Sequence, residues 1–93
     1  MQEKKLYSTL LDMLHAAEKK DASKVAELNR QFIPEYNRVM PKQYKSGSLP
    51  DIYDTARNKI INSINDVLFS PEEKKEELEE AKRIISRIVE PED

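Results

Sequence analysis

Apolar side chains recur along most of this chain at the spacing of an α-helix. Near the start, Leu6, Leu10, Met13, Leu14 and Ala17 fall on one face at about 100° per residue. The branched apolar residues nowhere alternate with polar ones, as they would in a half-buried strand. The pattern therefore predicts an all-α fold, with helices over about residues 3–19, 22–40, 49–69 and 71–90.

Two of these helices begin with a recognisable N-terminal signature. Ser48 and Ser70 each precede a proline in the first turn and an acidic residue three positions on. In such a capping box the serine oxygen accepts the backbone N–H of the third residue, whose carboxylate accepts the serine N–H. Asp21 or Ser23 is expected to cap the second helix through its side-chain oxygen.

The second helix contains Pro34, which removes a backbone hydrogen bond and tends to bend a helix. The apolar stripe keeps its phase across Pro34, and the proline falls on the opposite, solvent side. We therefore predict one helix over 22–40, kinked at Pro34, with two separate helices as the alternative. Pro41 is expected to end it, and residues 42–47 to form the main loop.

Short connections between amphipathic helices favour antiparallel neighbours, so we expect one domain over residues 1–93, folded as an up-down four-helix bundle. Residues 72–77, at the start of the last helix, are all charged and are expected on the surface. The core is expected to contain Leu10, Met13, Leu14, Leu28, Phe32, Tyr36, Ile60, Ile64, Val67, Leu78, Ile85 and Ile88.

Composition excludes several functional classes. The chain has no cysteine and one glycine, which excludes disulfides and thiolate metal sites and leaves little scope for phosphate-binding loops. Its apolar runs are too short for insertion into a membrane, and Met1–Lys5 does not lead into the apolar core of a signal peptide. We therefore expect a cytoplasmic protein.

Candidate catalytic chemistry is sparse. His15 is the only histidine and lacks the spaced partners of a metal site. No serine is set in a recognisable nucleophile motif, and one histidine would have to serve any triad. We expect a non-enzymatic chain without cofactor or metal.

Binding to another protein is the favoured function. A small regulator or inhibitor of that protein would act in this way. Arg57 lies on the apolar side of its helix, where it can either cover the core edge or anchor an interface. Asn29, within the stripe of the second helix, also has two interpretations. It can be a hydrogen-bonded residue at the edge of the core, or a buried residue that fixes the helix register or the oligomeric state. The third helix carries a row of uncharged polar residues opposite its core side: Thr55, Asn58, Asn62 and Asn65. Hydrogen bonding to a partner would explain this row, and sequence drift is the alternative explanation. The expected partner-binding residues are Arg38, Lys42, Tyr44, Lys45, Arg57 and Asn62.

Charge is uneven along the chain. Residues 30–59 carry six basic against three acidic side chains, and residues 70–93 carry nine acidic against five basic. This asymmetry can orient a charged partner or a second copy in a homo-oligomer, or can simply be a solvated surface. Basic and aromatic residues at 38–45 leave nucleic-acid binding as an alternative, weakened by a net charge of −2.

The layout of four helices with Leu49–Pro50 near the start of a long third helix resembles the small immunity proteins that protect bacteriocin producers. The resemblance implies a helical protein that protects its host by binding another protein. Those proteins tend to be basic, whereas this chain is mildly acidic. An immunity-like role is therefore a further alternative.

Overall fold

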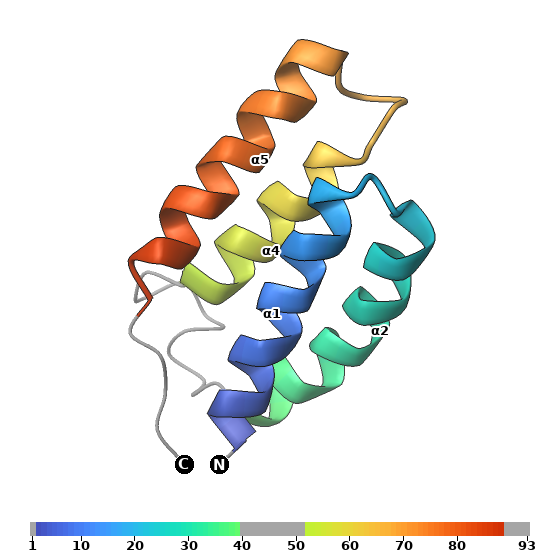
Figure 1. Ribbon diagram of the computed structural model, residues 1–93. Helices are drawn as coiled ribbons and strands as arrows, with labels where there is room; N and C mark the ends of the chain where they lie inside the picture. Colours follow the sequence, from blue (N-terminus) through green and yellow to red (C-terminus); the bar gives the residue numbers. More distant parts are fainter. Residues whose placement is uncertain (1, 40–51, 89–93) are drawn as a thin grey trace.

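The computed structural model describes residues 2–39 and 52–88 of the 93-residue chain. Over these residues it contains four helices and no strand (Figure 1). With the numbering of Figure 1, they are α1 (Gln2–Glu18), α2 (Ala22–Val39), α4 (Ile52–Ser63) and α5 (Pro71–Ser86). The predicted all-α fold is confirmed.

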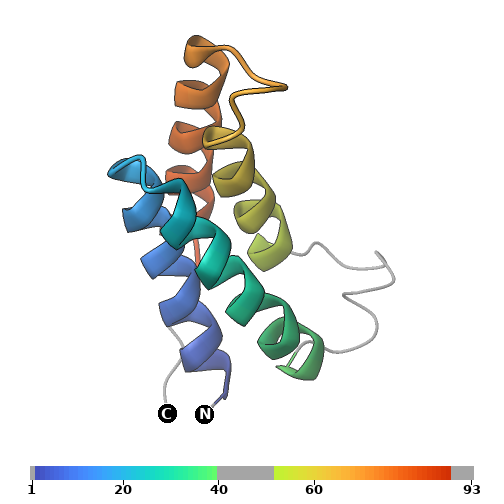
Figure 2. The same ribbon diagram turned by 90° about the vertical axis from the view of Figure 1, so that its right-hand side faces the viewer.

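The helices run alternately up and down, as predicted. Figures 1 and 2 show α1 and α2 as one antiparallel pair and α4 and α5 as a second. Helix α1 packs against each of the other three helices, whereas α2 packs chiefly on α1. The bundle is therefore organised around α1 rather than as a symmetric square.

A single apolar cluster joins the helices. Most of the predicted core is buried, with Tyr36, Ile64 and Leu78 at its margin. Leu6, Val25 and Tyr53 are also buried, and so are four alanines that allow close helix approach: Ala16, Ala17, Ala56 and Ala81. Val67 was assigned to the core from its helical phase, and that prediction is wrong, since its side chain is 91% exposed.

The connection between α1 and α2 is a tight turn at residues 19–21. Lys20 adopts a left-handed backbone conformation (φ 59°), a position where glycine is usual. The N–H of Asp21 donates to the Ala16 carbonyl (2.9 Å) and the N–H of Lys20 to the Ala17 carbonyl (3.0 Å), which completes a Schellman motif. Asp21 Oδ1 then accepts the N–H of Lys24 and caps α2, as one of the two predicted caps.

Helix α2 is continuous from Ala22 to Val39 with Pro34 inside it, so the single-helix prediction is confirmed. Pro34 is exposed, on the side opposite the buried Val25, Leu28 and Phe32. Water can therefore reach the carbonyl that the proline leaves without a donor. The kink expected at Pro34 stays a prediction.

Helix α4 is shorter than the sequence predicts. It ends at Ser63 instead of residue 69, and a non-helical turn follows. The hydroxyl of Ser63 donates to the Ile60 carbonyl (2.6 Å), and Asn65 Oδ1 accepts the N–H groups of Val67 and Leu68 (both 3.0 Å). Side-chain acceptors thus replace the helical carbonyls of the missing turns.

Helix α5 begins as predicted. Ser70 Oγ accepts the Glu73 N–H (3.2 Å) and the Glu73 carboxylate accepts the Ser70 N–H (2.9 Å), so the capping box is complete. The helix ends at Ser86 rather than near residue 90. At this end, the N–H of Arg87 donates to the Ile84 carbonyl (3.0 Å). The equivalent box at Ser48, and Leu49–Pro50 with it, lie outside the described residues.

Candidate interaction surface

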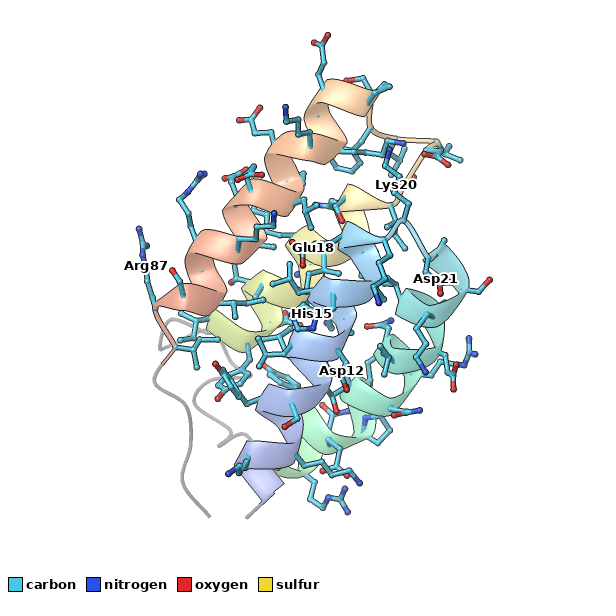
Figure 3. All side chains as sticks on the ribbon, viewed as in Figure 1. Asp12, His15, Glu18, Lys20, Asp21 and Arg87 are labelled. Carbon is cyan, nitrogen blue, oxygen red and sulfur yellow. The ribbon has the colours of Figure 1, made fainter. Side chains whose placement is uncertain are left out.

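One end of the bundle carries a hollow of about 440 Å³. It lies where the end of α1, the start of α2, the end of α4 and the first turns of α5 meet (Figure 1). Its lining includes the buried Ala17 and the half-buried Ile64 and Leu78. Exposed Lys20 and Lys75 also line it, and Figure 3 shows Lys20 at the α1–α2 junction. Because Glu18 and Asp66 line it as well, the hollow combines an apolar lining with charged side chains of both signs.

A turn with two exposed apolar side chains adjoins this hollow. Asp66 belongs to the lining, and Val67 and Leu68 follow it directly. Val67 is 91% and Leu68 73% exposed, far more than the other large apolar residues of the described chain. We call residues 64–70 the apolar turn. Adjacent exposed apolar residues beside a hollow are a typical feature of a docking surface.

The apolar turn is braced by polar contacts. Asn65 holds the backbone of Val67 and Leu68 as described above, and the Phe69 N–H donates to the Asn65 carbonyl (3.2 Å). Lys74 on α5 forms an ion pair with Asp66. The backbone of the turn is therefore held in place, although the side chains of Val67 and Leu68 are exposed.

A polar seam joins α4 to α5. The ammonium of Lys59 lies 3.2 Å from Glu77 Oε2 and 3.4 Å from Glu80 Oε1, and the Asn62 amide donates to Glu77 Oε1 (2.7 Å). The side chain of Glu77 is only 13% exposed. Glu77 thus departs from the expectation that all of residues 72–77 are fully solvated.

The seam shifts the protonation equilibria of its members. The hydrogen bond from Asn62, aided by Lys59, lowers the pKa of Glu77 below its ordinary value despite the opposing effect of burial. The hydrogen bond to Glu77 raises the pKa of Lys59. Near the hollow, Lys82 lies 3.1 Å from Glu18, and this contact raises the pKa of Lys82. All three groups are held in their charged forms.

Arg57 makes its contacts within the bundle. Its guanidinium donates to Asp54 Oδ1 (2.8 Å) and Asn58 Oδ1 (3.0 Å), and across to Asn29 Oδ1 on α2 (3.3 Å). Its side chain is 19% exposed. The structure thus brings together Arg57 and Asn29, two residues that the sequence singled out separately, as a bridge between α4 and α2.

The uncharged polar row is also engaged internally. Asn58 accepts from Arg57, Asn62 donates to Glu77, and Asn65 caps the apolar turn. The sequence alone suggested either partner binding or sequence drift for this row. The hydrogen bonds give each of the three asparagines a structural role within the chain instead. Binding of a partner by Asn62 stays a prediction.

Arg38 is exposed in the last turn of α2, where its guanidinium forms an ion pair with Glu35. Lys5 of α1 lies 3.5 Å from the same carboxylate oxygen, while Oε2 of Glu35 is buried with no hydrogen-bond partner among the described residues. Lys42, Tyr44 and Lys45 lie outside the described residues. The predicted basic surface around Arg38 therefore stays a prediction.

Residues suited to metal binding do not converge in the described ranges 2–39 and 52–88, where no group of three His, Asp or Glu side chains could hold an ion. His15 is exposed on α1, between Asp12 and Glu18 in sequence (Figure 3).

None of the described helices has the length and apolar character needed to cross a membrane.

Comparison with known proteins adds no relative: no protein family, curated protein or solved structure matches this chain. Function must therefore be argued from the surface itself. Sequence reasoning missed the apolar turn because Val67 and Leu68 continue the helical phase. The available signal was Asn65–Asp66, a pair of turn-forming residues directly before them.

Proposed function

We propose that this chain is a non-enzymatic protein-interaction module, a small regulator or inhibitor that binds through the apolar turn and the adjoining hollow. The observation that carries the proposal is the exposure of Val67 and Leu68 on a braced turn. Burial of two such side chains favours association, and a turn that is already ordered loses little entropy on binding. The expected site of action is the cytoplasm.

The polar seam and the Arg57 bridge support the choice of this surface over the polar face of α4. Their side chains are already hydrogen-bonded within the bundle. A partner that used them would have to break those contacts, whereas Val67 and Leu68 are exposed without such a cost.

Site-specific photo-cross-linking tests the proposal. A photoreactive amino acid is placed at Val67 and, as control, at the exposed Ser8 on α1, and each variant is irradiated in its native cells. We expect a defined protein adduct at position 67 that is absent at position 8 and is lost when Leu68→Lys is added. Equal adducts at both positions, or none at 67, would contradict the proposed surface.

The predicted basic surface requires a separate variant. Reversal of charge at Arg38 would place a second carboxylate beside the buried Glu35 and destabilise α2. Arg38→Gln combined with Lys45→Glu avoids most of this effect. If the basic surface binds the partner, this pair weakens adduct formation without a change in Tm. Capture of bulk DNA or RNA that collapses as salt rises would instead indicate nucleic-acid binding.

A further inference from the structure

The helical hydrogen bonding that follows α4 is interrupted at Asn65. Before the interruption, the Asn65 N–H donates to the Asn62 carbonyl (3.1 Å), as in the tightened last turn of a helix. After it, the Phe69 N–H donates to the Asn65 carbonyl (3.2 Å), which is again the spacing of an α-helix. Two pieces of helical backbone therefore meet at this asparagine.

The side chain of Asn65 stabilises the interruption. Its Oδ1 accepts the N–H groups of Val67 and Leu68 (both 3.0 Å), the second and third residues after it. This is the hydrogen-bond pattern of an N-cap residue, whose own backbone lies outside the helical conformation. In a continued helix the same two N–H groups would donate to the carbonyls of Ser63 and Ile64. The two arrangements thus exchange one pair of hydrogen bonds for another.

The exposed apolar side chains favour the continued helix. Val67 is 91% and Leu68 73% exposed in the apolar turn. On a continued α4 they would follow the half-buried Ile64 by three and four residues. Val67 would also follow the fully buried Ile60 by seven. Both side chains would then lie on the face of α4 that packs against the core.

Two other features favour the apolar turn. A helix that reaches Leu68 leaves Phe69 and Ser70 as the connection to α5, which is at the short limit for antiparallel helices. The ion pair between Lys74 and Asp66 braces the turn in its present conformation. Opposing contributions of this kind can hold two conformations of one segment close in free energy.

We propose that Asn65 is a conformational hinge, at which residues 64–70 exchange between the apolar turn and a continuation of α4 that covers Val67 and Leu68. The role of this exchange is to regulate the binding surface, and that role rests on the proposed function. The continued helix withdraws the two side chains that a partner would bury. A partner that buries them selects the turn.

Thiol labelling measures the two states, because the chain has no cysteine of its own. A maleimide should react readily with Val67→Cys and with Ser8→Cys, a control at an exposed position of α1. Asn65→Ala removes the cap and introduces a good helix former, so it should slow the reaction at position 67 at least about fivefold and leave position 8 unchanged. The matched control is Asn65→Asp, which keeps a capping oxygen and should change the rate less than about twofold.

Relaxation-dispersion NMR tests the exchange in the unaltered chain. We expect microsecond-to-millisecond exchange at the backbone amides of residues 66–69, with helical chemical shifts in the minor state. A chain without this exchange overturns the proposal. So does a folded Asn65→Ala chain in which the thiol at position 67 reacts as fast as before. If Asn65→Ala unfolds, as far-UV circular dichroism would show, the relaxation data decide alone.

Photo-cross-linking at position 67 separates the hinge from the proposed function. An adduct that forms in the unaltered chain and is lost with Asn65→Ala supports both. An adduct without exchange leaves the proposed function standing and refutes the hinge. Exchange without an adduct refutes the proposed function and leaves the hinge. An undiminished adduct in an Asn65→Ala chain that covers position 67 contradicts the regulatory role.

Discussion

The contrast between Leu10 and Leu68 gives the most direct test of the architecture. Leu10 on α1 is completely buried, whereas Leu68 in the apolar turn is 73% exposed. Substitution of either leucine by alanine removes the same atoms from the side chain. Any difference in the free energy of unfolding therefore reports the surroundings of the two residues and not the chemistry of the change.

The expected magnitudes follow from the exposed fractions. Leu10→Ala should cost about 2–5 kcal/mol, since it removes a fully buried side chain and leaves a cavity. Full burial of a leucine is worth about 1.5–3 kcal/mol, and Leu68 has only about a quarter of its surface covered. Leu68→Ala should therefore cost roughly 0.4–0.8 kcal/mol.

Urea unfolding followed by far-UV circular dichroism measures both values at low micromolar protein. Comparable m-values show that the two variants unfold from equally compact states. A cost above about 1.5 kcal/mol for Leu68→Ala would refute the exposed turn. Leu68 would then be packed against the core, as expected of a third helix that continues to residue 69.

Three further changes test the helix termini, the proline and the seam. Ser70→Ala removes the cap of α5 and should lower the free energy of unfolding by about 1 kcal/mol in urea titrations. Pro34→Ala should raise Tm, with a gain of about 1–3 kcal/mol, because it restores a backbone donor inside α2. The folded pKa of Glu77 lies below its unfolded value, so its contribution is present above about pH 4.3 and is lost as the pH falls through the folded pKa. Glu77→Gln should accordingly reduce the loss of stability between neutral and acidic pH, and an unchanged acid limb would contradict the seam.

The helix positions and most core residues could be predicted because local rules decide them. A period of 3.6 residues identifies the buried face of α1 and α2, and Ser70 with Glu73 identifies the start of α5. Continuity through Pro34 follows from the unbroken stripe. None of these inferences requires knowledge of how the helices are arranged in space.

The end of α4 could not be read from the same period, because Val67 and Leu68 stay in phase with Ile60 and Ile64. Asn65 Oδ1 accepts hydrogen bonds from the N–H groups of Val67 and Leu68, and these two bonds compete successfully with the helical ones. Asparagine favours turns by this mechanism, yet the apolar stripe concealed it.

The pairing across the seam escaped prediction for a different reason. Lys59, Asn62 and Glu77 become neighbours only when α4 and α5 adopt one particular axial register. Helical period gives the face of a residue but not its height against the next helix. The charged start of α5 therefore resembled a uniformly solvated face, in which Glu77 could not be distinguished from Glu76.

That register also explains the candidate interaction surface. Because Asn62 near the end of α4 lies opposite Glu77, the first turns of α5 extend beyond the last residue of α4 (Figure 1). The chain must span this overhang between Ser63 and Pro71, so residues 64–70 leave the helical path and Val67 becomes exposed. The hollow lies between the overhang and the α1–α2 junction. A single feature, the register set by the seam, thus produces both the apolar turn and the hollow of the proposed binding surface.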